Sequence, residues 1–186
     1  MILSNKMILE KIAKGEIFIG NNAIKGISPV ELKFDTTSLN LHLSDEIYSW
    51  KKMKGVVIDP CSPDFNFKKF AEENSTKESC KQGFTIEPGE FVLACTEEYV
   101  KLPSSIAARV EGRSSLGRMG ISVHVTAPTI HALFEGNITL EIFNHSKYNL
   151  NIQAGMKIAQ LIFENVEGEI EIMNERTFNR QLKPTG

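Results

Sequence analysis

Apolar and polar residues alternate over most of this chain. From Glu16 onward the period is close to two, which is typical of strands with one buried face. Turn-forming stretches such as Gly20-Asn21-Asn22 and Glu87-Pro88-Gly89-Glu90 separate the alternating runs. Many short strands joined by turns predict a mainly β fold, either a barrel or a jelly roll. The clearest runs contain Ile17 and Ile19; Leu39, Leu41 and Leu43; Phe91 and Leu93; Ile121, Val123 and Val125; and Ile138, Leu140 and Ile142.

The N-terminus carries the only long helical pattern in the sequence. Four residues there fall on one stripe of a helix, namely Met7, Ile8, Lys11 and Ile12. Ser4 is suited to cap such a helix, and Gly15 supplies a stop signal. We therefore expect a short N-terminal helix that ends at about Lys14.

The length and composition fit a single domain that spans residues 1–186. Apolar residues make up 41% of the chain, enough for one sizeable core. Residues 62–82 are rich in Lys, Glu, Asn and Ser, so burial offers little to offset their ordering entropy, and we interpret them as a surface insertion. Residues 175–186 are also polar, and we expect them to form a mobile C-terminal tail.

Charge and cysteine content exclude several classes of protein. The net charge of −2 provides no basic field for a nucleic-acid partner. The three cysteines form no Cys-x-x-Cys pair and match neither a disulfide framework nor a zinc site, so we expect free thiols. Cys95 has no base beside it in sequence, which favours a small core residue over a nucleophile. The sequence has no run of 18 apolar residues and no signal peptide, so we expect a cytoplasmic protein that does not bind membranes.

The stretch from Val110 to Gly120 combines glycines, hydroxyls and arginines. Ser114 and Ser115 open what is predicted to be one short helical turn, whose first amides have no intrahelical acceptors. Arg113 and Arg118 flank this turn, and each guanidinium is suited to bidentate contact with phosphate oxygens. A phosphate site is one interpretation. A capped turn with solvated arginines is the other, and the turn alone does not separate them.

Two alternating segments follow this turn. We expect a strand over residues 121–127, with Ser122, His124 and Thr126 on the face opposite the aliphatic residues. Glu141 alternates out of phase with its aliphatic neighbours, so its side chain faces either solvent or a lined pocket. A pocket would make Glu141 a candidate general base.

An ordered set of motifs is similar to the dCTP deaminase branch of the trimeric dUTPase superfamily. The resemblance covers most of the chain. Its most specific elements are Gly112-Arg113-Ser114-Ser115-Leu116 with Arg118, then His124-Val125-Thr126-Ala127, and then Leu140-Glu141-Ile142. It also includes Thr37 to Leu43, Pro88 to Ala94, and Ala154 to Phe163.

The resemblance implies a homotrimer of distorted jelly-roll protomers with active sites at the subunit interfaces. By position, Arg113, Ser114 and Ser115 would hold the triphosphate, Glu141 would be the general base, and Arg118 would orient water. The backbone from Val125 to Ile130 would line the cytosine, and Gln181 of a neighbouring tail would close over the phosphates. Magnesium would enter bound to the nucleotide phosphates, in keeping with its preference for oxygen ligands.

The implied reaction is hydrolytic deamination of dCTP to dUTP and ammonia. Zinc deaminases need His-x-Glu and Pro-Cys-x-x-Cys segments, and neither occurs in this sequence, so we expect no zinc. Glu141 would activate the water by moving its protons, and the hydroxyl of Ser114 would help to fix that water. The expected ligands are dCTP and dUTP, and the sequence leaves open whether dTTP also binds.

Three positions depart from the family pattern. His131 replaces an aspartate near the deoxyribose, where an imidazole still hydrogen-bonds a sugar hydroxyl but supplies no permanent negative charge. We therefore expect dUTP as the product rather than cleavage to pyrophosphate. Asn40 and His42 replace an Asp and an Arg, which suggests that a buried ion pair has become a neutral pair. Two alternatives stay open: a dUTPase or bifunctional deaminase-diphosphatase, and a non-catalytic nucleotide-binding relative.

Overall fold

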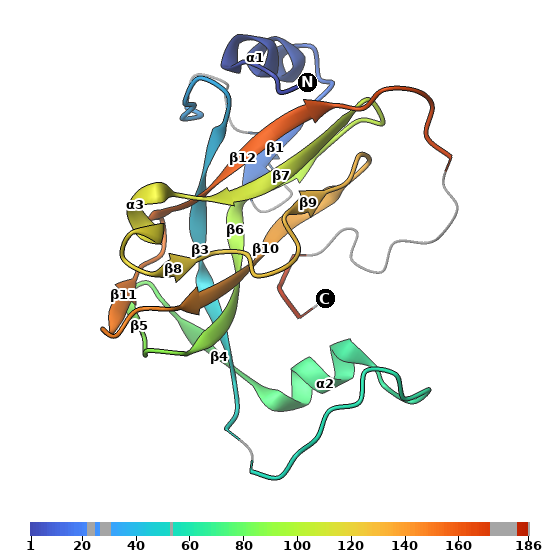
Figure 1. Ribbon diagram of the computed structural model, residues 1–186. Coiled ribbons are helices and arrows are strands. Elements are labelled where there is room, and N and C mark those ends of the chain that lie inside the picture. Colours follow the sequence, from blue (N-terminus) through green and yellow to red (C-terminus); the bar gives the residue numbers. More distant parts are fainter. Residues whose placement is uncertain (22–24, 27–30, 53, 172–181, 186) are drawn as a thin grey trace.

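A computed structural model describes residues 1–21, 25–26, 31–52, 54–171 and 182–185. In this part of the chain the strands form one curled sheet of ten strands and a small sheet of two (Figure 1). The mainly β fold with a jelly-roll or barrel character is therefore confirmed. The strands are β1 (Phe18–Asn21), β2 (Lys25–Gly26), β3 (Leu39–Trp50), β4 (Ser75–Ser79), β5 (Phe84–Ile86), β6 (Phe91–Lys101), β7 (Ile106–Gly112), β8 (Ile121–Ser122), β9 (Thr129–Ile130), β10 (Glu135–Asn144), β11 (Leu150–Ile152) and β12 (Lys157–Asn165).

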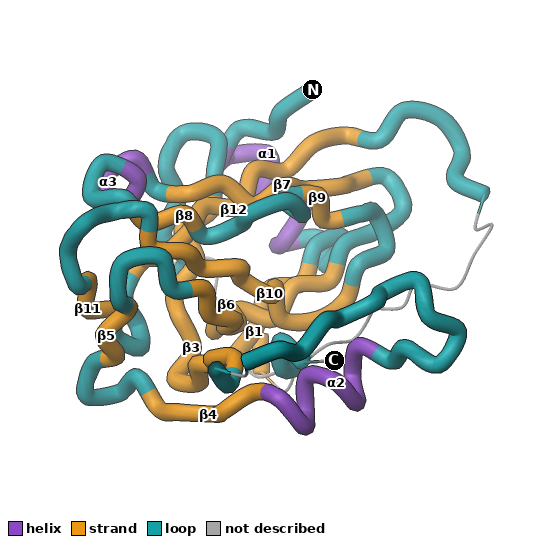
Figure 2. Tube along the Cα trace, turned by 60° about the horizontal axis from the view of Figure 1, so that its bottom comes forward, coloured by secondary structure: helices purple, strands orange, loops and turns teal. Residues whose placement is uncertain are grey.

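The strand order explains the curl of the large sheet. Its main path runs β2-β1-β6-β3-β12-β7-β9, with β4 beside β3 and with β10 joining β6 to β8. All of these pairs are antiparallel. Figure 2 shows the strands wrapped around a common interior. The β3, β6 and β10 ladders contain register shifts, and such irregularities bend a strand.

The alternating residues of the sequence fill this interior. Leu39, Leu41 and Leu43 of β3 are 0% exposed, as are Leu140 and Ile142 of β10. Burying a Leu or Ile side chain completely stabilises a fold by roughly 1.5–3 kcal/mol, so these positions fix which face of each strand points inward.

The predicted N-terminal helix is present as α1 (Asn5–Ala13). The hydroxyl of Ser4 accepts a hydrogen bond from the Met7 amide, as a cap should. Ile8 is fully buried and anchors the helix on the sheet. The chain leaves the helix at Gly15, which adopts a φ of 72°.

The strand expected over residues 121–127 is wrong beyond its first two residues. Only β8 (Ile121–Ser122) pairs, with the end of β10. The amides of Val125 and Thr126 bond to the side chain of Glu141 instead of to a neighbouring strand. Pro128 then has no amide hydrogen to donate. A loop therefore stands where the alternation predicted a strand.

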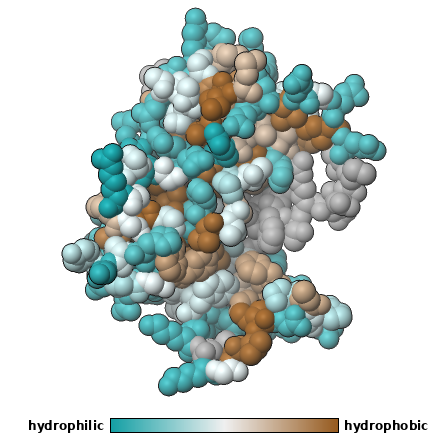
Figure 3. All heavy atoms as spheres, viewed as in Figure 1, coloured by the Kyte–Doolittle hydropathy of each residue, from teal (hydrophilic) through white to brown (hydrophobic). Residues whose placement is uncertain are grey.

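Residues 62–82 contain regular structure that the sequence pattern did not predict. Helix α2 (Phe67–Asn74) begins at Asn66, whose side chain accepts the Lys69 amide, and β4 then returns along β3. Trp50 packs on Phe70 with ring centroids 5.3 Å apart, so aromatic contact helps to order the segment. Together with the preceding loop it forms an arm below the sheet in Figure 1. Figure 3 shows apolar side chains on this arm, where Val56, Val57 and Ile58 are exposed.

The C-terminal end packs back on its own chain. Pro184 and Thr185 are buried, and Lys183 forms an ion pair of 3.6 Å with Glu72 of α2. Residues 172–181 lie outside the described residues, and so does the expected contact of Gln181 with phosphate. No helix in the described part of the chain is long and apolar enough to span a membrane.

Candidate active site

The predicted helical turn is present as α3 (Ser114–Gly117). The carbonyl of Arg113 accepts the amides of Leu116 and Gly117, both at 2.9 Å, and the buried Leu116 side chain holds the turn on the sheet. Ser114 and Ser115 are exposed at its start, and no side chain caps it. Two hydroxyls and the first amides of the turn therefore face outward, in an arrangement suited to an anion.

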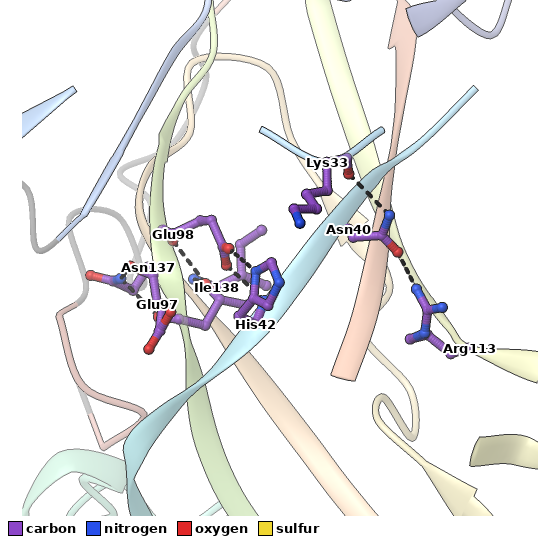
Figure 4. Close-up of polar contacts among 9 residues, drawn as sticks. Lys33, Asn40, His42, Glu97, Glu98, Arg113, Asn137 and Ile138 are labelled. Atoms are coloured by element: carbon purple, nitrogen blue, oxygen red, sulfur yellow. Dashed lines mark hydrogen bonds and ion pairs between the residues drawn. The ribbon is translucent and has the colours of Figure 1, made fainter. Parts of the chain in front are cut away.

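The two arginines occupy opposite ends of α3. Arg113 is half-buried, and its Nη1 donates to Oδ1 of Asn40 on β3 (Figure 4). Arg118 is exposed and follows the turn as its C-cap. The structure thus fixes Arg113 through a buried partner and leaves Arg118 exposed.

Glu141 is half-buried on β10 and is tied to the loop after β8. Its Oε2 accepts the amide of Val125 at 2.8 Å and that of Thr126 at 3.0 Å. Its own amide donates to the carbonyl of Val123 at 3.0 Å. The carboxylate therefore faces the loop after β8 and helps to order it. Oε1 has no hydrogen-bond donor among the described residues.

The segment between α3 and this loop runs along the end of β10. Ser122 pairs with Phe143, and the His145 amide donates to the Gly120 carbonyl at 2.8 Å. The same side of the sheet therefore carries α3 and the Glu141 loop. Within the described part of this one chain, however, no hydrogen bond joins Arg113, Ser114 or Arg118 to Glu141. The predicted residues form two groups, one around α3 and one around Glu141.

Ile130 and His131 lie at the far end of the loop. Ile130 is buried and pairs with Ala108 of β7. His131 is exposed and begins a tight turn in which its carbonyl accepts the Phe134 amide at 3.2 Å. Leu133 in this turn has a φ of 63°, a left-handed conformation that costs a branched residue about 1 kcal/mol or more.

The expected neutral pair of Asn40 and His42 is wrong. The two side chains share one face of β3, and among the described residues no hydrogen bond joins them. Asn40 contacts Arg113, whereas Nδ1 of His42 lies 2.7 Å from Oε1 of Glu98 on β6 (Figure 4). This hydrogen bond with Glu98 raises the pKa of His42 above its usual value. Glu98 is 4% exposed, and its only signal in the sequence is an acidic pair within an apolar strand.

The donor set around α3 does not resemble a protein metal site. Arg113 and Arg118 repel a cation, and no carboxylate or imidazole belongs to this set. The described residues also contain no group of three His, Cys, Asp or Glu side chains that could hold a metal ion.

Comparison with known proteins identifies the family. A family model described as dCTP deaminase-like matches residues 2–166. The protein of Methanobrevibacter smithii named dCTP deaminase, dUMP-forming, is 36% identical over 188 residues, covering 98% of this chain and 92% of that protein. The protein of the same name from Hydrogenobaculum sp. is 39% identical over 168 residues, covering 90% of this chain and 84% of that protein.

A solved structure supports the fold independently. The 2'-deoxycytidine 5'-triphosphate deaminase from Agrobacterium tumefaciens superposes with a TM-score of 0.66 at 20% sequence identity over 89% of this chain. This chain spans about half of that one, 49% of its length. The family predicted from the motifs is confirmed: the chain belongs to the dCTP deaminase-like family and is an enzyme of that family.

Proposed function

We propose that the chain hydrolyses dCTP to dUMP, with release of ammonia and pyrophosphate. The names of its relatives support dUMP as the product in place of the dUTP that we expected from His131. The overall change uses two waters. One replaces the amino group on C4 of cytosine, and the other cleaves the bond between the α- and β-phosphates.

The contact of Glu141 with the loop after β8 carries the proposal. Because Oε2 is held by the amides of Val125 and Thr126, Oε1 is left to meet a ligand that lies on this loop. In the deamination step Oε1 takes a proton from the attacking water while oxygen bonds to C4. Glu141 passes that proton to N3, then takes the proton of the hydroxyl now on C4 and gives it to the amino nitrogen, so that the C4–N bond breaks, ammonia leaves and the C4 carbonyl forms. A general base of this kind typically contributes 10²–10⁴-fold to a rate.

The loop itself supplies the base pocket in this proposal. The backbone from Val125 to Ile130 offers donors and acceptors that read the edge of a cytosine. The exposed Val125 side chain, 53% accessible, offers an apolar surface for the ring. His131, exposed beyond this loop, would hydrogen-bond a sugar hydroxyl.

The α3 residues form the phosphate half of the proposed site. Arg113, Ser114 and Ser115 would bind the triphosphate oxygens, and Arg118 would orient the attacking water. Ser114 would also hold that water through its hydroxyl. Magnesium would enter with the nucleotide and neutralise charge on the phosphates. These residues would then bind the phosphates rather than the ion.

The separation of the two groups supports an assembly in which neighbouring protomers complete each site. We propose a homotrimer in which the α3 group of one protomer faces the Glu141 group of the next. Closed cyclic symmetry gives such a trimer three equivalent sites. Gln181 of a tail would close over the phosphates.

A second candidate product is dUTP. It is favoured by the exposed imidazole of His131, because a histidine supplies no permanent negative charge to activate the water that attacks the α-phosphate. The relative from Natronomonas pharaonis, 33% identical, is named dCTP deaminase without a stated product. Deamination is common to both candidates.

A product assay separates them. The purified protein is incubated with dCTP and magnesium, and ammonia, pyrophosphate and the nucleotide product are measured over time. Equal release of ammonia and pyrophosphate, with dUMP as product, is the result that we expect. Release of ammonia without pyrophosphate would show that the product is dUTP and not dUMP. Pyrophosphate release from dUTP, with no ammonia release from dCTP, would show a dUTPase, and no turnover of either nucleotide would refute the proposal.

A further inference from the structure

Among the described residues, Arg113 makes one side-chain hydrogen bond, to Asn40. Asn40 lies on β3, is 4% exposed, and its Oδ1 accepts a hydrogen bond from Nη1 of Arg113. The two residues are 73 positions apart in sequence, so this bond joins the start of α3 to a strand on another part of the sheet. Figure 4 shows the two side chains pointing toward one another.

A network fixes the orientation of the Asn40 amide. Nδ2 donates to the carbonyl of Lys33 at 3.0 Å and approaches Oδ2 of Asp35 at 3.5 Å. Oδ2 of Asp35 also accepts Nε2 of Gln160 at 2.8 Å, and Gln160 pairs with Asn40 across the β3–β12 ladder. Because Nδ2 is committed to these acceptors, Oδ1 is the atom left to face Arg113.

The charge of this partner matters for what Arg113 does. A guanidinium has five N–H donors and stays charged at any ordinary pH. Asn40 accepts from one of its nitrogens and brings no negative charge of its own. The nearest carboxylate in the network, Asp35, already receives hydrogen bonds from Asn40 and Gln160. Arg113 is thus oriented through a neutral acceptor, which leaves its remaining donors and its charge for an anion.

We propose that Asn40 is a positioning residue for the triphosphate: it acts through Arg113 and does not touch the substrate. The inference rests on the proposed role of Arg113 in holding phosphate. It adds a residue from β3 to a site otherwise built from α3, Glu141 of β10 and the loop after β8. It also gives Asn40 a role in nucleotide affinity that a purely structural residue would not have.

The test compares Asn40→Leu with Asn40→Asp. Leu has a similar size and no acceptor, so Arg113 loses its orientation, and the KM for dCTP should rise about tenfold or more. The kcat should change less than about threefold, because binding rather than proton transfer is affected. Asp keeps an acceptor for Arg113 but adds a negative charge beside it, so its KM should lie between those of the wild type and of Asn40→Leu. Asn40→Ala repeats the test with a smaller side chain if the Leu variant does not fold.

A double variant shows whether Asn40 acts through Arg113. In an Arg113→Ala background, Asn40→Leu should change KM by less than about twofold, since its partner is gone. Asn165→Leu, an exposed site at the end of β12, serves as the matched control and should leave both constants unchanged. If Asn40→Leu lowers kcat with KM unchanged, or raises KM equally in the Arg113→Ala background, the inference is wrong. A wild type that turns over no dCTP would instead overturn the proposed function, and the inference with it.

Discussion

Nδ1 of His42 lies 2.7 Å from Oε1 of Glu98, and the His42 amide donates to the other oxygen of the same carboxylate at 2.9 Å. The pair joins β3 to β6 in a place where Glu98 is almost inaccessible to water. Lys157, across the β3–β12 ladder, and Glu97 also face the imidazole. A buried carboxylate of this kind is tolerated because both of its oxygens are hydrogen-bonded.

This pair predicts a pH dependence of stability. The folded state raises the pKa of His42, mainly through the hydrogen bond with Glu98, so folding favours the protonated imidazole. The contribution is therefore complete below the unfolded pKa, about 6.5, and is lost as the pH rises through the higher folded value. The unfolding free energies of the wild type and of His42→Gln should differ by on the order of 1 kcal/mol more at about pH 6 than at about pH 9.

Urea unfolding at the two pH values measures this difference. His131→Gln, at an exposed imidazole, is the matched control for loss of a histidine. If the difference in unfolding free energy between the wild type and His42→Gln is constant with pH, or grows toward alkaline pH, the role of the protonated pair is contradicted.

Two glycines that flank the Arg118 region should respond in opposite ways to a methyl group. Gly120 has a φ of 93°, and a Cβ there would lie 2.8 Å from Cβ and 2.9 Å from the backbone nitrogen of Ser146. Gly117, in α3, has nothing within 4 Å of its Cβ position. We predict that Gly120→Ala lowers the unfolding free energy by about 2 kcal/mol or more, whereas Gly117→Ala leaves it unchanged or raises it by up to about 1 kcal/mol. Chemical denaturation measures the unfolding free energy of both variants. Equal changes in the two would show that Gly120 does not pack on Ser146.

The three thiols should differ sharply in reactivity. Burial raises the pKa of Cys95 to about 12 and also raises that of Cys80, whereas Cys61 is exposed. Since the thiolate is the reactive form, iodoacetamide at about pH 8 should label Cys61 alone in the folded protein. Mass spectrometry of digested samples identifies the labelled residue. Cys61→Ser should abolish the labelling of the folded protein. Rapid labelling of folded Cys95 would contradict its burial.

The sequence pattern predicted the inward faces of the strands but not their ends. Leu39 to Leu43 and Ile138 to Ile142 alternate cleanly, and the structure buries them as expected. The strand through Val125 failed because a side chain 16 residues away, Glu141, takes its amide. Helix α2 was missed because it is short and polar, and the aromatic partner that helps to order it, Trp50, lies outside the segment.

The candidate site shows the same division between local and distant signals. The turn at α3 follows from a local run of residues, and the structure contains it. The partner of Arg113 could not be predicted, because Asn40 reaches it only after β3 and β7 have each paired with β12. The pairing of His42 with Glu98, 56 positions apart, has the same cause. Contacts between distant strands depend on register, which alternation alone does not specify.

Mixed trimers should show whether the two groups of site residues come from different protomers. Trimers made of Glu141→Gln protomers alone, or of Arg113→Ala protomers alone, should be impaired. A Glu141→Gln protomer still carries Arg113, and an Arg113→Ala protomer still carries Glu141. If the site spans two protomers, unfolding and refolding an equal mixture should restore about a quarter of the sites. The assay is ammonia release at low dCTP concentration. No gain above the sum of the separate variants would place the whole site within one protomer.

The rate of ammonia release by Glu141→Gln tests the central claim most directly. Gln keeps a carbonyl oxygen that accepts the amides of Val125 and Thr126, so the loop and the melting temperature should be preserved. It cannot take a proton from water, and kcat should fall by about 10²–10⁴-fold while dCTP still binds. A folded Glu141→Gln protein that releases ammonia within about tenfold of the wild-type rate would contradict a general base at this position.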